Sequence, residues 1–72
     1  MDDAREKLQI LLDYWIAHNS EHKKEFRDWA DKIASSSTEV AQQLQAAATK
    51  MAAVSAELTK ARQALLKSKE IH

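Results

Sequence analysis

The sequence predicts an all-α fold, an antiparallel two-helix hairpin, from three observations. Its 72 residues include no Gly, no Pro and no Cys, so the usual turn-formers, helix breakers and disulfides are missing. Apolar residues in each half recur at alternating spacings of four and three, as in a helix that packs along one side. A run of hydroxyl residues separates the two halves. We therefore expect one domain, residues 1–72.

The first helix is expected from about residue 3 to about residue 34. Large and apolar side chains follow the alternating spacing along this whole segment, with two polar interruptions. The predicted packing seam of this helix is Leu8, Leu12, Trp15, Asn19, His22, Phe26, Trp29 and Ile33. Its three aromatic members are expected to be core residues, because aromatic side chains at seam positions bury large apolar areas.

A turn is expected at about residues 35–38, where four hydroxyl side chains follow one another. Hydroxyl groups compete for backbone hydrogen bonds and favour caps and turns over helix interiors. Ser36, followed three residues later by Glu39, is typical of a capping box at the start of a second helix. The alternative is one unbroken helix of about 100 Å, at about 1.5 Å per residue, since no Gly or Pro forbids it.

The second helix is expected from about residue 38 to about residue 69. Its predicted seam is Val40, Leu44, Ala47, Met51, Val54, Leu58, Ala61 and Leu65. A turn near Ser36 places large residues of the first helix opposite smaller ones of the second, such as Trp15 opposite Leu58. Small residues would also let another helix approach closely. The second helix supplies many alanines for this, namely Ala46, Ala47, Ala48, Ala52, Ala53 and Ala56.

A homodimer that forms a four-helix bundle is expected, because so small a domain buries only about 60% of its unfolded surface. Further apolar residues beside the seam widen the apolar stripe beyond what one partner helix covers, and these are Ile10, Leu11, Ile16, Leu66 and Ile71. The predicted oligomer core is Leu8, Leu12, Trp15, Phe26, Trp29, Leu44, Met51 and Leu58.

The charges predict a protein without nucleic-acid or membrane partners. Eleven acidic and eleven basic residues are interspersed along both halves and form no basic stripe for nucleic acid. No apolar run approaches the roughly 18 residues that span a bilayer. The acidic segment at residues 1–6 is not typical of a signal peptide, so we expect a cytoplasmic location.

A cluster of metal-binding side chain types lies halfway along the first helix. His18, His22 and Glu25 are spaced by four and three residues, so they project within about 60° of one another. Two imidazoles and a carboxylate are ligands that divalent transition metals accept, and the expected cofactor is Ni, Co, Zn or Cu. Asn19 and Glu21 are candidate auxiliary groups, and ligands from a second chain would complete the site.

The alternative is a structural oligomerisation or adaptor module that binds no metal. His22 and Asn19 would then set helix pairing, as buried polar layers do in coiled coils. Such layers forgo apolar burial worth about 1.5 to 3 kcal/mol for each large side chain, which favours the metal hypothesis. We find no nucleophile paired with a base and no Gly-rich phosphate loop, so we expect no enzyme activity. A di-metal enzyme assembled across a dimer is a third hypothesis.

The segment from Tyr14 to Ala30 resembles a small uncharacterised helical domain of anaerobic bacteria and archaea. The resemblance rests on a W-I-x-H-N-x-x-H-x-x-E-F-x-x-W-A pattern, which the sixteen residues from Trp15 to Ala30 match. The resemblance implies a role in transition-metal handling, with His18 and His22 as the matching positions.

Overall fold

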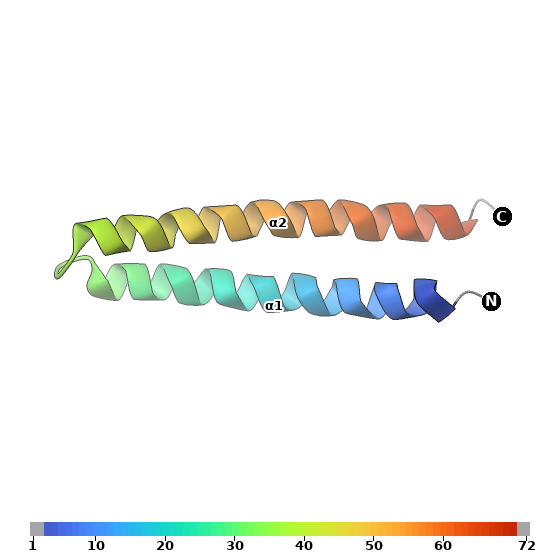
Figure 1. Ribbon diagram of the computed structural model, residues 1–72, viewed down its shortest axis with the longest axis horizontal. Helices are drawn as coiled ribbons and strands as arrows, with labels where there is room; N and C mark the ends of the chain where they lie inside the picture. Colours follow the sequence, from blue (N-terminus) through green and yellow to red (C-terminus); the bar gives the residue numbers. More distant parts are fainter. Residues whose placement is uncertain (1–2, 71–72) are drawn as a thin grey trace.

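The computed structural model describes residues 3–70, with side chains from 3 to 67, as two long antiparallel helices (Figure 1). Helix α1 spans Asp3–Ile33 and helix α2 spans Thr38–Glu70. The hairpin measures 56 × 15 × 11 Å, and the start of α1 lies beside the end of α2. The predicted antiparallel hairpin is confirmed, and the alternative of a single long helix is wrong.

The turn occupies residues 34–37, and backbone hydrogen bonds close α1 at this point. The amides of Ser36 and Ser37 both donate to the carbonyl oxygen of Ile33, at 2.9 and 2.8 Å. The Ser37 side chain then accepts a hydrogen bond from the amide of Val40 at 3.2 Å. Ser37 is therefore the N-cap of α2, and the prediction that Ser36 caps this helix is wrong by one residue. The α1 end at Ile33 and the α2 end at Glu70 also differ by one residue from the expected bounds.

The two helices pack along a seam whose buried residues are mainly alanines. Its fully buried residues are Leu12, Ala30, Ala41 and Ala48, each at most 8% exposed. Alanines let two helix backbones approach closely, so they take the centre of the seam. Half-buried residues continue the seam along the hairpin, and they include Gln9, Ile16, Asn19, Lys23, Phe26, Ile33, Leu44, Met51, Ser55, Leu58, Arg62 and Leu65.

The predicted seam is therefore wrong at alternate positions. It is correct at Leu12, but Trp15 is 39% exposed and Trp29 is 58% exposed. Val40 and Val54 on α2 are each 48% exposed, where neighbouring residues take the seam instead. The physical reason is size: an indole ring does not fit between backbones that alanines bring together, so the tryptophans lie beside the seam.

The displaced apolar residues share one side of the hairpin, which we call the open face. Both helices are right-handed and they run antiparallel. Residues that come just before the seam in the rotation of α1 therefore lie on the same side of the hairpin as residues that come just before the seam in the rotation of α2. The open face comprises exposed residues of both helices, namely Leu8, Leu11, Trp15, Trp29, Val40 and Val54. Ile10, at 69% exposed, points elsewhere; Ile16 and Leu66 are half-buried, and Ile71 lies outside the described residues.

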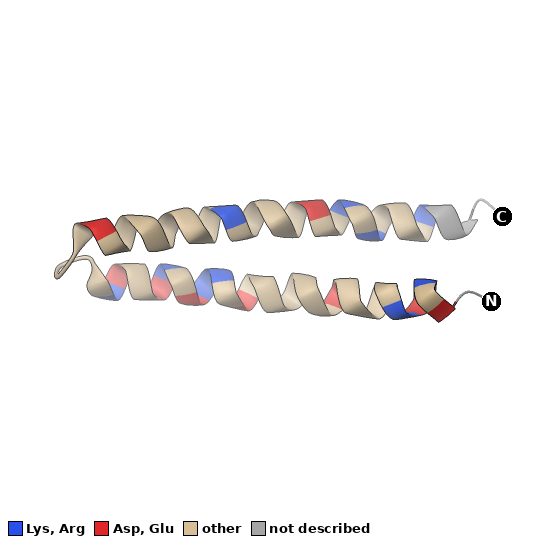
Figure 2. Ribbon diagram, in the orientation of Figure 1, with Lys and Arg blue, Asp and Glu red and all other residues tan. Residues whose placement is uncertain are grey.

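The other side of the hairpin, which we call the polar face, carries exposed polar residues. These residues are Glu6, Asp13, Arg27, Gln42, Thr49 and Gln63. At its edge the Arg62 guanidinium donates a hydrogen bond to the Asp13 carboxylate and links α2 to α1. Charged residues occur along both helices, but the stretches 14–20 of α1 and 40–49 of α2 contain no Lys, Arg, Asp or Glu (Figure 2). No helix among residues 3–70 is long and apolar enough to cross a membrane.

Candidate metal centre

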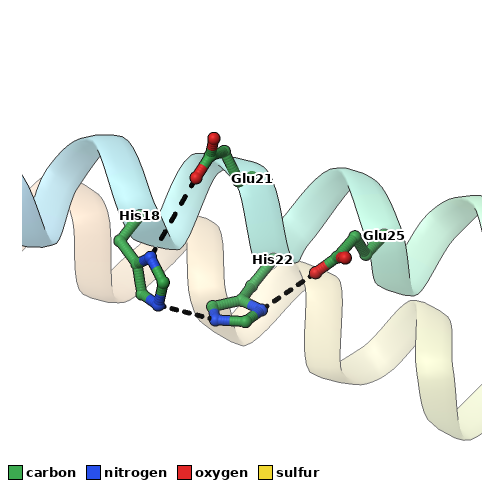
Figure 3. Close-up of polar contacts among 4 residues, drawn as sticks. All are labelled: His18, Glu21, His22 and Glu25. Atoms are coloured by element: carbon green, nitrogen blue, oxygen red, sulfur yellow. Dashed lines mark hydrogen bonds and ion pairs between the residues drawn. The ribbon is translucent and has the colours of Figure 1, made fainter.

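The histidine and glutamate side chains of the predicted cluster lie together in the middle of α1 (Figure 3). His18 and His22 are one helical turn apart and project from the same side of α1 (Figure 3). The rotation of the helix places this side next to Leu11 and Trp15 of the open face. Their side chains are 46% and 40% exposed, whereas those of Glu21 and Glu25 are 79% and 65% exposed. The two imidazoles are thus partly covered, and the carboxylates flank them on the solvent side.

The two imidazoles meet through their Nε2 atoms. The Nε2 atom of His22 lies 2.9 Å from the Nε2 atom of His18, a hydrogen-bond distance. The ring centroids are 4.4 Å apart, and the ring planes are nearly perpendicular at 88°. One of the two Nε2 atoms therefore carries the hydrogen, and the lone pair of the other accepts it.

Glu25 determines which tautomer His22 adopts. Its carboxylate oxygen lies 3.1 Å from Nδ1 of His22, so this nitrogen donates its hydrogen to Glu25. A neutral imidazole carries one hydrogen, so the Nε2 atom of His22 is the acceptor and His18 is the donor. Glu21 lies 4.0 Å from Nδ1 of His18 and contacts that ring only loosely. The cluster is therefore a polarised chain that runs from His18 through His22 to Glu25.

Aromatic rings on either side restrict the two imidazoles. Tyr14 stacks on His18 with centroids 5.3 Å apart and planes 14° apart. Phe26 stacks on His22 with centroids 6.0 Å apart and planes 21° apart. The four rings follow one another at four-residue spacing along α1. This spacing is visible in the sequence and could have assigned Tyr14 and Phe26 to the cluster. The stacking limits rotation of both imidazoles.

One chain brings two nitrogen ligands together, not three ligands. Within the described part of the chain, no group of three or more His, Cys, Asp and Glu residues is arranged to hold a metal ion. Glu25, predicted as a ligand, contacts the ring nitrogen of His22 that faces away from His18. Asn19, predicted as an auxiliary group, is half-buried on the seam side of α1. The imidazole pair alone is arranged around a common point.

Comparisons with known proteins place this chain in a family. The family model described as "Domain of unknown function (DUF8180)" matches residues 8–65, and the chain belongs to this family. An uncharacterized protein of Archaeoglobus fulgidus is 43% identical over 56 residues, which cover 78% of this chain and 90% of that protein. No solved structure matches the chain. The predicted resemblance to a small uncharacterised domain is confirmed, while the sixteen-position pattern stays a prediction.

Proposed function

We propose that this member of the DUF8180 family is a non-enzymatic helical protein that binds a divalent transition metal in a homo-oligomeric bundle. The ligands are the Nε2 atoms of His18 and His22. The observation that carries the proposal is the distance of 2.9 Å between these two atoms. Two imidazole nitrogens that each lie about 2.0 to 2.1 Å from one metal ion are about 2.9 Å apart at a right angle and about 3.3 Å apart at the tetrahedral angle, so the two rings are already close to the spacing of a ligand pair.

The surroundings of the pair favour metal binding further. Metal binding requires the hydrogen on Nε2 of His18 to move to Nδ1 of the same ring, the nitrogen that lies 4.0 Å from the Glu21 carboxylate. Both Nε2 atoms then offer lone pairs to one metal ion that lies beside the line joining them. Glu25 holds the hydrogen on Nδ1 of His22 and leaves Nε2 free to bind, as second-sphere carboxylates do for metal-binding histidines. Imidazole ligands suit Ni, Co, Zn and Cu, which are the metals we propose. Glu25 thus acts as an orienting group in this proposal, not as a third ligand.

The second candidate function is a structural oligomerisation or adaptor module without a metal. It is favoured by the hydrogen-bonded chain from His18 to Glu25, which gives both ring nitrogens of His22 a partner without any ion. In that case Asn19 sets the pairing of the two helices, and His22 sets the pairing of the hairpin with a partner.

A metal titration tests the proposal. Metal-stripped protein is titrated with Ni, Co, Zn and Cu while tryptophan emission and the thermal unfolding midpoint are measured. We expect at least one metal to bind, and a metal at 100 times its dissociation constant to add about 2.7 kcal/mol to the free energy of unfolding. The same titration is made with the His18→Ala/His22→Ala variant, and with His72→Ala as the control for the remaining histidine of the chain.

The variants separate the two candidate functions. The proposal expects the double variant to lose binding and the control to keep it. Equal binding by all three proteins would contradict a site at His18 and His22. No binding by the parent, together with a changed oligomeric state of the double variant, would favour the structural module.

The role of Glu25 is tested by Glu25→Gln. Loss of the carboxylate that holds Nδ1 of His22 is expected to weaken metal affinity by about 10- to 100-fold. Glu21→Gln is the matched control, because Glu21 is more exposed and only loosely contacts His18. Equal effects of the two substitutions would contradict an orienting role and would indicate a general effect of negative charge.

A further inference from the structure

The hairpin exposes more surface than a compact monomer of the same mass does. A compact monomer of 8.2 kDa exposes about 4,500 Å². This chain exposes 5525 Å², an excess of about 1,000 Å². A standard protein interface buries about 800 Å² from each partner. The excess therefore matches what one partner would cover.

Apolar side chains gather on the open face, so this is the surface that a partner would cover. Six of the eight large apolar residues that are exposed in the described chain belong to it. The tryptophans are among them, and tryptophan is enriched at the centres of protein interfaces. The chain carries a formal net charge of zero, so a second copy meets no overall repulsion.

The imidazole pair borders this open face and is incomplete as a metal site. Zinc and related ions in stable sites take four ligands or more, and one chain offers two. The pair, His18 and His22, also lies close to the midpoint of α1, because this helix spans Asp3–Ile33 and its central residue is 18. A second copy that covers the whole length of the open face therefore brings its own imidazole pair to the same level.

The spacing of the residues beside the seam also suits a second copy. Leu8, Trp15, His22 and Trp29 recur at intervals of seven, so they form one column along α1. This column is symmetric about the point between residues 18 and 19. When a second α1 lies antiparallel to the first, Leu8 faces Trp29 of the other copy and Trp15 faces His22. The column is then complementary to itself, as a twofold interface requires.

From these observations we infer that a second copy of this chain docks on the open face with its turn at the opposite end. In this register the twofold axis passes between residues 18 and 19, so His18 of each copy lies at the axis. His22 of each copy lies one turn further along and points back toward the axis, because helical side chains tilt toward the N-terminus. The two imidazole pairs together complete one four-nitrogen metal site. This inference rests on the proposed metal function, and it adds the partner, the stoichiometry and the source of the remaining ligands.

A substitution far from the ligands tests whether the site is shared. Val54 lies on the open face of α2, and Val54→Glu introduces a charge there without changing either histidine. With the parent we expect a dimer that binds one metal ion per two chains. With Val54→Glu we expect a monomer of unchanged helix content whose metal affinity is weaker by at least 10-fold. Ala53→Glu, also exposed but turned away from the open face, is the control and should behave like the parent.

Mass measurement by light scattering and metal titration distinguish the outcomes. A monomeric Val54→Glu variant with parental metal affinity would overturn the shared site and leave the proposed metal function standing. A parent that binds no metal would end both. A parent that binds one metal per chain as a monomer would overturn only the inference.

Crosslinking tests the orientation without relying on metal, since the chain has no cysteine of its own. In the inferred dimer, position 8 of one copy faces position 29 of the other, while two copies of position 8 lie about 31 Å apart at 1.5 Å per residue. A mixture of Leu8→Cys and Trp29→Cys proteins should therefore form a disulfide-linked dimer on oxidation, and neither protein should do so alone. Crosslinking of each variant with itself, and not with the other, would overturn the inferred arrangement.

Discussion

The open face and the polar face flank the same seam, yet their chemistry differs. The open face carries two tryptophans and four aliphatic residues, with an imidazole pair at its margin. The polar face carries glutamines, a threonine and charged residues, and it bears the contact between Asp13 and Arg62. Isolated exposed apolar residues are normal, whereas apolar residues gathered on one side of a molecule are typical of interaction surfaces, which supports the inferred dimer. The seam of the hairpin therefore uses only part of the apolar stripe of each helix.

The largest expected effect separates the seam from the open face. Leu12 is 2% exposed, so Leu12→Ala removes packing from the seam and should lower the free energy of unfolding by about 2 to 5 kcal/mol. Leu11→Ala is the matched control, because Leu11 is the sequence neighbour of Leu12 and is 43% exposed on the open face. Urea unfolding followed by circular dichroism, at protein concentrations low enough to keep the chain monomeric, measures both. Equal losses would contradict the assignment of the seam.

The next effect separates the open face from the polar face. Trp29→Ala should weaken self-association by about 2 kcal/mol, because large aromatic residues dominate interface energies. Arg27→Ala on the polar face should leave self-association unchanged. Analytical ultracentrifugation measures both dissociation constants. A larger effect of Arg27→Ala would show that the polar face is the interface and would reverse the comparison.

A smaller effect concerns the turn, which sets where α2 begins and hence which of its residues face α1. Ser37→Ala removes the side chain that caps α2 and should lower the free energy of unfolding by about 1 kcal/mol. Ser36→Ala is the control and should cost much less, since Ser36 contributes to the turn through its amide, which alanine keeps. Thermal unfolding of the two variants decides between Ser37 and the sequence-predicted Ser36 as the cap.

The smallest effect is expected on the polar face. The ion pair between Asp13 and Arg62 joins the helices, but its side chains are 52% and 37% exposed. Exposed ion pairs contribute about 0 to 1 kcal/mol, so a double-mutant cycle with Asp13→Ala and Arg62→Ala should give a coupling energy below about 1 kcal/mol. Raising the salt concentration should reduce it further. A coupling energy of several kcal/mol would mean that the polar face, too, is important for the fold.

Part of the candidate site was predictable from the sequence and part was not. The four-residue spacing of His18 and His22 places two imidazoles on one side of a helix wherever that helix packs. The same spacing does not tell which ring nitrogen Glu25 contacts. That contact depends on rotamers, and stacking by Tyr14 and Phe26 restricts them. The proposed orienting role of Glu25, in place of the predicted third ligand, rests on that contact.

The sequence by itself determined the two helices, their approximate ends and their antiparallel arrangement. These features follow from local causes: alternating apolar spacing, hydroxyl residues between the halves and the absence of Gly and Pro. Only the tertiary structure decided which edge of each apolar stripe became the seam. The stripes are wider than one contact, and close packing of two backbones selects small side chains such as Ala30 and Ala48 over the tryptophans. That selection depends on both helices at once, and it left the open face exposed beside the imidazole pair.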